Sequence, residues 1–571
     1  MAVNSPNKKK RGRVIPFERN GEFFLRLGSQ RMEKNDLVEA ISLYHRALRA
    51  EPENVEIQLA IAEVLTEMHR YEQSNRLLFS LLSGKDSPTE CFFGIACNFL
   101  GLQEFSHAYE SLENYLALDP EGDFADDAMD MMEVIEDRDV LYSMPGIQSP
   151  DEHEAVNVCA KGRRLLELGR AKEAIKLIKD AAEKWPDMLF VHNNLALAYF
   201  CDRDYEGAMR AVRDVLLEDS RNVQAHCNLL LFMHAARDEE GVERELVFLK
   251  AADSRDMQDW NRMAVVFLEM EQTAEALSVL KKLQAAYPYD EGTLHRLAMC
   301  RYLQGRYELA RDCYDRLLKI DPNDTVAAYY RRVCHNAADG KKESVDWLCH
   351  YEVPYAEILR RVRYINEKSR LPADDLKKLW SGDARFRALL NWSLHLPDAS
   401  AKRALITMIA GFNDKEAELM LRRFQMDQMQ PDAIKHDVFA LLKRMRAPEP
   451  YIAYLGGRLV QSKVQLRRLS KDNLPISYRR VLEAVVQSMQ NGRGGDTMIE
   501  AADIFQKYLN ALREPPRLKE QQIYAMAAAL EYLACRNRGE DATKTQLADR
   551  YGVTLLRLKN AINNILRALE E

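Results

Sequence analysis

Four polar side chains recur at one place in successive stretches of the sequence, and their chemistry is that of peptide recognition. They follow one another at intervals of 34 residues and are Asn194, Asn228, Arg262 and Arg296. An asparagine amide can hold a peptide backbone whatever its side chains, and an arginine can hold a carboxylate through two parallel hydrogen bonds. The spacing therefore predicts a groove for an acidic or carboxylate-bearing segment. The same residues also suit a solvated helix face, and both interpretations stay open.

A second set of polar residues lies near the C-terminus, in the stretch "TKTQLADRYGVTLLRLKNAINNIL". Gly552 can form the tight turn of a helix-turn-helix, between an inward pair, Leu547 and Ala548, and an inward stripe that includes Leu558. The side chains expected to point outward include types that read base edges, and they are Thr554, Arg557, Lys559, Asn560, Asn563 and Asn564.

Charge gives this second set only partial support. From Leu518 to Glu571 there are eight Lys or Arg against seven Asp or Glu, so the stretch has no net basic footprint. A basic stretch just upstream, which includes Arg467 and Arg468, could contact phosphates or could be a solvated face. DNA contact, protein docking and a purely structural role are the open alternatives.

Motifs of enzyme chemistry are missing from the sequence. There is no GxxxxGK[ST] loop, and the glycine-rich "NGRGGD" has helical stretches on both sides and no Lys-Ser or Lys-Thr pair. Two adjacent Cys-His pairs occur, but neighbouring side chains on a helix point about 100° apart and do not easily meet one ion. We predict no enzyme, no cofactor and no bound metal.

The composition is that of folded, soluble material. The chain has 571 residues, with 47% hydrophobic and 30% charged residues and a net charge of −7, so it needs several domains or a repeat array. Ten cysteines without a CxxC pair are typical of a reducing compartment. The basic N-terminus is not followed by an apolar stretch, and no segment is long and apolar enough to span a membrane, so we expect a cytoplasmic protein.

Small residues recur every 34 positions and indicate helical hairpins. One column consists of Gly162, Ala196, Leu230, Ala264 and Ala298, and a second of Ala174, Ala208, Val242, Ala276 and Ala310. The same columns occur earlier as Gly28, Ala62 and Ala96, and as Ala40, Ser74 and Ala108. A small residue in the first helix of a pair lets the second approach closely, and the second helix carries an apolar stripe, as in "EAISLYHRAL".

These columns, with turns such as "LGRAKEA" and "QGRYELA", closely resemble the tetratricopeptide repeat (TPR) family over residues 21–122 and 155–324. The resemblance implies an all-α solenoid of helical hairpins, in which the first helices line a concave groove that binds protein or peptide ligands. The Lys/Asn/Arg carboxylate clamp of chaperone-binding relatives is absent.

The C-terminal stretch carries a second resemblance. The Ala-rich "AAALEYLACR", followed by the helix-turn-helix, is similar to the second half of a cyclin-like repeat of the transcription factor B family. The relatives in that family bind DNA, which is what this resemblance implies for residues from Thr554 onward.

The expected organisation has six parts. They are a basic disordered N-terminus (1–20), a first TPR block (21–122), an acidic linker (123–154), a second TPR block (155–324), further HEAT-like helical pairs (325–460) and a cyclin-like helix-turn-helix domain (461–571). We expect a scaffold or adaptor that captures partner proteins in its groove. The alternative is a transcriptional regulator whose C-terminal module contacts DNA. The oligomeric state is left open.

Overall fold

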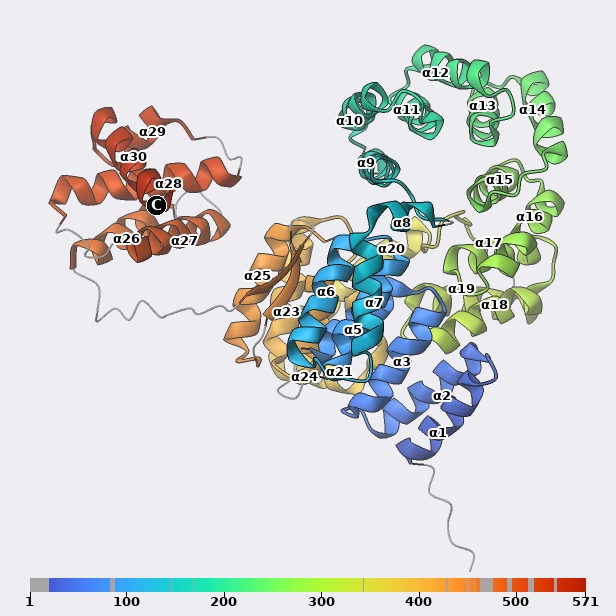
Figure 1. Ribbon diagram of the computed structural model, residues 1–571, viewed down its shortest axis with the longest axis horizontal. Coiled ribbons are helices and arrows are strands. Elements are labelled where there is room, and N and C mark those ends of the chain that lie inside the picture. The colour runs from blue at the N-terminus through green and yellow to red at the C-terminus, as the bar shows by residue number, and fades with distance from the viewer. Residues whose placement is uncertain are drawn as a thin grey trace, which may run out of the picture. The chain divides into compact units, whose positions relative to one another are not determined.

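The computed structural model of the chain is a succession of helices (Figure 1). It describes residues 20–82, 88–144, 146–167, 169–341, 344–427, 430–448, 451–455, 458–462, 476–489, 495–511, 518–538 and 542–570. These residues fall into two compact units, the first drawn from Met1–Gln430 and Arg444–Gln461, and the second from Pro431–Lys443 and Ser462–Glu571.

The first unit opens with three helical hairpins. Their helices are α1 (Gly21–Met32), α2 (Leu37–Ala50), α3 (Val55–Glu67), α4 (Tyr71–Leu81), α5 (Glu90–Gly101) and α6 (Phe105–Leu118). Two helices follow in the stretch expected to be an acidic linker, α7 (Ala125–Glu136) and α8 (Arg138–Ser143).

Five further hairpins and the first helix of a sixth form the next part of the same unit. They are α9 (Pro150–Glu167), α10 (Ala171–Lys184), α11 (Leu189–Cys201), α12 (Tyr205–Glu218), α13 (Val223–Ala235), α14 (Glu239–Ala251), α15 (Met257–Glu269), α16 (Thr273–Ala286), α17 (Glu291–Leu303), α18 (Tyr307–Ile320) and α19 (Thr325–Ala338). We call α9–α18 the second block.

The columns of small residues lie where helices cross. Ala196, Ala264 and Ala298 are fully buried. A Cβ atom added to Gly162 would lie 2.5 Å from Cδ1 of Ile178 on the paired helix, which is closer than real contacts allow. The close approach of the two helices is therefore the physical reason for the column.

Two more columns repeat at 34 residues. Asp or Asn side chains accept a hydrogen bond from backbone N–H groups at the start of α13, α15, α17 and α19, and they are Asn222, Asp256, Asp290 and Asp324. A residue with positive φ lies in the turn between the two helices of each of the five hairpins, namely Gly169, Arg203, Arg237, Glu271 and Gly305. The sequence thus fixes both ends of the hairpins locally.

The rest of the first unit departs from a regular stack. Its helices are α20 (Tyr355–Lys368), α21 (Ala373–Gly382), α22 (Ala384–Ser393), α23 (Ala399–Phe412) and α24 (Lys415–Met426). A hairpin of two strands, β1 (Tyr451–Leu455) and β2 (Arg458–Ser462), follows in a stretch that we expected to be helical. The all-α solenoid is confirmed, with this hairpin as a small local exception.

Segments far apart in sequence meet inside the first unit. Helix α2 packs against α18, and α4 packs against α24. Nε2 of His45 donates to the Ile320 carbonyl at 2.8 Å, and Arg70 forms an ion pair with Glu291 at 2.7 Å. The first hairpins are therefore bound to the last hairpin of the second block.

The second unit has a buried central helix. Its helices are α25 (Asp432–Arg444), α26 (Ile476–Met489), α27 (Gly495–Ala511), α28 (Glu520–Arg538), α29 (Lys544–Arg550) and α30 (Leu555–Glu570). Helix α28 packs against α26, α27, α29 and α30. Its run of small residues, including Ala527, Ala528 and Ala529, is fully buried, which lets four helices approach it.

Candidate functional site

The inner face of the second block is built by the first helices of its hairpins. Helices α9, α11, α13, α15 and α17 contact one another in succession, and Figure 1 shows them on the inner side of the curve, with the second helices outside. We call their exposed side the inner face. It is the surface on which the four side chains predicted for peptide recognition were expected.

The two asparagines lie at this face but are largely buried. Asn194 is 4% exposed, and its amide donates to the Phe190 carbonyl at 2.7 Å. Asn228 is 7% exposed and donates to the Asn193 carbonyl at 3.0 Å. Their amides already bond the backbone of the repeats. Their use by a ligand stays a prediction and would require them to exchange these partners.

Two arginines lie closest to an open binding surface. The Arg262 side chain is 26% exposed, pairs with Asp259 at 3.5 Å and donates to Gln258 at 3.2 Å. Arg163 on α9 is exposed and donates to Oδ1 of Asn194 at 3.4 Å. Burial lowers the pKa of Arg262, while the carboxylates of Asp259 and Asp256 act in the opposite direction. Arg262 thus already has a carboxylate partner, and Arg163 is the more exposed of the two guanidinium groups.

Arg163 was missed by the sequence analysis. It stands three residues after position 160 of the predicted column, hence on the same face of its helix. The equivalent places in the next three hairpins hold Leu197, Leu231 and Val265, which are half-buried. This second column is thus apolar after its first member, and a search one helical turn beyond the predicted column could have found the arginine.

Arg296, the fourth predicted residue, is covered by the protein's own chain. It is 8% exposed, donates to Oδ1 of Asn261 at 2.6 Å and donates to the Cys349 carbonyl at 3.2 Å. Burial lowers its pKa. Arg296 thus holds a main-chain carbonyl of the covering segment, and its use by a ligand carboxylate stays a prediction.

The covering segment, residues 344–354, is irregular with a bend at 349–352, and it contacts α17 and α19; we call it the strap. Alternate strap residues pack into the apolar core of these helices, namely Val345, Trp347, Cys349, Tyr351 and Val353. The Trp347 ring stacks on Tyr330, with 4.8 Å between ring centroids. Nε2 of His295 donates to the Leu348 carbonyl at 2.9 Å, and the Tyr330 hydroxyl donates to the Glu352 carbonyl at 2.8 Å.

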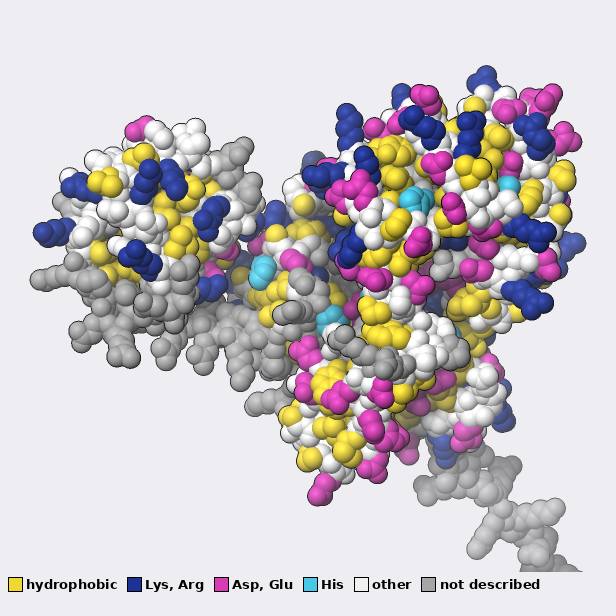
Figure 2. Space-filling view, turned by 45° about the horizontal axis from the view of Figure 1, so that its top comes forward, with side chains coloured by type: hydrophobic (Ala, Val, Ile, Leu, Met, Phe, Trp, Pro, Cys, Tyr) yellow, Lys and Arg dark blue, Asp and Glu magenta, His cyan; other side chains and the backbone are white. Residues whose placement is uncertain are grey.

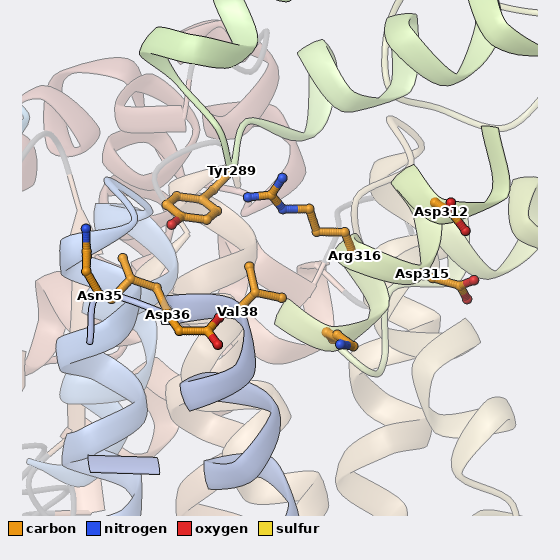
Figure 3. A pocket seen from close by; sticks show the side chains of 9 residues that line it. Asn35, Asp36, Val38, Tyr289, Asp312, Asp315 and Arg316 are labelled. Atoms are coloured by element: carbon orange, nitrogen blue, oxygen red, sulfur yellow. The ribbon is translucent and has the colours of Figure 1, made fainter. Parts of the chain in front are cut away.

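A hollow of about 490 Å³ lies where the first hairpins meet α18 (Figure 3). It is lined by Asn35, Asp36, Leu37, Val38, Tyr289, Asp312, Asp315, Arg316 and Lys319. The Arg316 guanidinium reaches over the Tyr289 ring, 5.2 Å from its centroid, and Lys319 pairs with Glu39 at 3.1 Å. The described residues that line this hollow are mostly charged or polar, as at a seam between packed helices.

Nucleophilic and metal-binding chemistry has little support in the described part of the chain. All ten cysteines are free, and seven are buried. Burial raises the pKa of Cys300 to about 11, which keeps its thiol protonated. No group of three His, Cys, Asp or Glu side chains that could hold a metal ion occurs among the described residues. None of the described helices is long and apolar enough to cross a membrane.

Two helices of the second unit, α29 and α30, flank the glycine at which the sequence predicted a tight turn. Gly552 has φ +62° between α29 and α30. Leu547, Ala548 and Leu558 are buried, as the pattern predicted, while Leu556 is 69% exposed.

The four predicted nucleic-acid residues on or next to α30, Thr554, Arg557, Lys559 and Asn560, are exposed. Arg557 donates to Gln521 of α28. The other two predicted residues, Arg467 and Arg468, lie outside the described residues.

A buried carboxylate supports the turn of this motif. Glu531 on α28 is 0% exposed and accepts from Ser488 Oγ at 3.0 Å, Arg550 Nη1 at 2.8 Å and the Tyr551 hydroxyl at 2.7 Å. It thereby removes one acidic group from the surface. On the face of the second unit seen in Figure 2, Lys and Arg side chains outnumber Asp and Glu.

Comparisons with known proteins identify the repeats. A tetratricopeptide repeat model matches residues 31–86 and 267–331, and a second model of the same description matches residues 159–222. The TPR repeat-containing protein YvcD of Bacillus subtilis (strain 168) is 29% identical over 231 residues, which are 39% of this chain and 46% of that protein. The chain thus spans about half the length of this relative.

Two solved structures show similar helical repeats at low overall similarity. The TPR domain of P58(IPK) has 16% identity and a TM-score of 0.22, over 57% of this chain and 99% of that one. The thermophilic TPR protein TTC0263 of Thermus thermophilus has 19% identity and a TM-score of 0.25, over 32% of this chain and 98% of that one. The matched segments 31–86, 159–222 and 267–331 of the present chain are therefore tetratricopeptide repeats.

Proposed function

We propose that the chain is a protein-binding scaffold that holds an extended segment of a partner along the inner face of its second block. The observation that carries this proposal is the strap, because it is a non-helical segment of chain whose main chain is held by the same series of helices. His295 and Arg296 hold its carbonyl oxygens at 2.9 and 3.2 Å. Arg296 belongs to the column that also contains Asn194, Asn228 and Arg262, so these residues offer a partner the same type of contact further along.

The charge of the inner face favours a partner segment that carries carboxylates. Arg163 and Arg262 are close enough for their charges to interact, and no strap residue contacts Arg262 among the hydrogen bonds of the described chain. A partner carboxylate that reaches either guanidinium group would gain charge-assisted hydrogen bonds, in competition with Asp259 at Arg262. Leu197 and Leu231 would contact its apolar side chains.

Site-specific photo-crosslinking tests this proposal. A benzophenone amino acid replaces Leu231 on the inner face or, as a control, Leu217, which is 84% exposed on the second helix α12. We expect the partner crosslinked in cells at position 231 to be absent at position 217. Equal crosslinking at both positions, or none at 231, would contradict an inner binding face.

Charge reversal then tests the preference for carboxylates. The double variant Arg163→Glu and Arg262→Glu should reduce crosslinking at position 231 at least tenfold. The matched control is Arg210→Glu with Arg213→Glu, two exposed arginines on α12. If the inner and outer reversals have the same effect, the preference for an acidic segment is wrong.

A second candidate function is DNA contact through the second unit. It is favoured by the exposure of Thr554, Arg557, Lys559 and Asn560 on one motif, and by the burial of Glu531. The Glu531 carboxylate is paired with Arg550, so its charge is compensated within the unit and does not oppose the exposed Arg557 and Lys559. The exposed Leu556 weighs against this candidate, because a groove-facing surface is usually polar.

A mobility shift with the full chain and a 30-base-pair duplex, across a salt series, tests this second candidate. Arg557→Glu with Lys559→Glu should abolish binding, while Lys507→Glu on α27 should leave it unchanged. Each lost phosphate contact lowers the slope of log affinity against log salt by about 1. Absence of binding at about 50 mM salt would leave only the scaffold.

A further inference from the structure

The strap occupies the inner face in the manner of a bound peptide. Its residues alternate regularly, with Val345, Trp347, Cys349, Tyr351 and Val353 facing the core of α17 and α19. The segment bends at residues 349–352, where the Glu352 N–H donates to the His350 carbonyl at 2.9 Å. Alternate side chains face the core on both sides of this bend and within it.

The side chains that hold the strap bond its main chain rather than its side chains. The carbonyls of Leu348 and Cys349 accept from His295 and Arg296, at 2.9 and 3.2 Å. The Glu352 carbonyl accepts from the Tyr330 hydroxyl at 2.8 Å. Main-chain contacts of this kind hold any extended segment, while the pockets for alternate side chains give specificity.

The main specificity pocket holds the indole of Trp347. Besides the stacked ring of Tyr330, the ring of Tyr302 lies 5.0 Å away and that of His295 5.8 Å away, measured between centroids. Aromatic groups on several sides suit a large planar side chain and leave little room for a charged one.

The fit of the strap is incomplete. Arg296 Nε and Trp347 Nε1 are buried donors that find no acceptor among the described residues. A buried donor without an acceptor costs free energy. The arrangement with the strap in place is therefore less stable than one in which a ligand accepts from these donors. The covering is therefore suited to displacement.

We propose that α17 and α19 form a peptide-binding seat that the strap fills in cis, and that its ligand in trans is an extended segment with an aromatic side chain at the place of Trp347. The inference rests on the proposed function, because the seat continues the inner face beyond Arg262. The strap competes with such a segment at the effective concentration of a tethered ligand, in the millimolar range for short linkers. A partner therefore binds the seat only where it outcompetes the strap or where the strap is weakened.

A synthetic peptide of residues 344–354, with a fluorescent label and Cys349→Ser, provides the probe. We expect it to bind the full chain carrying Trp347→Ala at least tenfold more tightly than the unaltered chain, since the variant strap leaves the pocket. Adding Tyr330→Ala to this variant should abolish the gain. A peptide with Trp347→Ala should bind neither chain.

Two further variants keep the test decisive. Trp347→Leu retains an apolar side chain and should raise the affinity for the peptide less than Trp347→Ala does. It replaces Trp347→Ala if that variant fails to fold. Trp260→Leu on α15, away from the seat, should not raise the affinity. Equal affinity of the peptide for the unaltered and Trp347-substituted chains would overturn the inference. Crosslinks at Leu231 report on the rest of the inner face, so failure of the seat is distinguishable from failure of the scaffold.

Discussion

Replacing Glu531 by methionine tests how the second unit holds the end of α29 against α28. Methionine keeps the length of the side chain and the helix propensity but cannot accept the three hydrogen bonds that Glu531 accepts at 2.7–3.0 Å. Burial raises the pKa of Tyr551, so its hydroxyl remains a donor and loses its acceptor. Arg550 is 44% exposed and can turn toward water.

The expected loss in free energy of unfolding follows from how exposed each hydrogen-bond partner of Glu531 is. A hydrogen bond from a buried hydroxyl to a carboxylate contributes about 1.5–3 kcal/mol, and the partly buried Ser488 contributes about 1 kcal/mol. The exposed Arg550 adds little after solvent screening. The sum is about 3 kcal/mol, which corresponds to roughly a 100-fold change in the equilibrium for opening this unit.

Hydrogen exchange of the full chain measures this effect locally, since the two units need not unfold together. Backbone amides of α28 should exchange about 100-fold faster in Glu531→Met. The matched control is Glu500→Gln on α27, where the carboxylate accepts an exposed hydrogen bond from Asn537 at 2.9 Å, and a change below about threefold is expected. If α28 exchanges equally in both variants, Glu531 does not hold the motif together.

Three further outcomes follow from local features of the first unit. Glu271 has φ +56° in the turn after α15, a backbone conformation that glycine adopts more easily. Glu271→Gly should therefore raise the urea midpoint and stabilise the chain by up to about 1 kcal/mol. A lower midpoint would contradict a positive φ at this residue. Burial lowers the pKa of His226, but its hydrogen bonds to Glu245 at 2.6 Å and to a backbone carbonyl raise it more, and the net pKa lies above 6.5. The free energy of unfolding should therefore exceed that of His226→Gln by its full amount below pH 6.5, and this excess should decline as the pH rises through the folded-state pKa. Urea unfolding of both chains at pH 6 and 8.5 checks this. An excess that is the same at both pH values would contradict the ion pair. Iodoacetamide should label the exposed Cys201 in the native chain long before the buried Cys300, as mass spectrometry would show; equal rates would contradict the buried thiol.

The sequence predicted the repeats well because their determinants are local. A small residue at each helix crossing, an Asp or Asn cap and a turn recur at one spacing, and each acts within a few residues of its place in the chain. Ala264 and Ala298 are buried where the columns put them. The pattern of apolar residues likewise predicted that Leu547 and Leu558 point inward, and both are buried.

Contacts between distant segments cannot be predicted from local patterns of residues. The covering of Arg296 comes from a strap that begins 48 residues later in the chain, with no repeat signal to announce it. The hairpin of β1 and β2 also lies outside any period. In the second unit, a count of charges along the chain could not show that Glu531 is buried.

Some expectations stay predictions. They concern the domain boundaries, the cyclin-like resemblance and the contacts of Asn194 and Asn228 with a ligand. The burial of these asparagines limits how they can act, because each amide already donates to a backbone carbonyl. Their contribution to binding should thus be smaller than that of the more exposed Arg163.

The most direct test of the scaffold is a hydrogen-exchange comparison between the free chain and its complex with the partner identified by crosslinking. Binding along the inner face predicts slower exchange in the first helices α11, α13 and α15, with the second helices α10, α12 and α14 unchanged. Protection confined to the second helices, or absent from residues 150–320, would contradict the account.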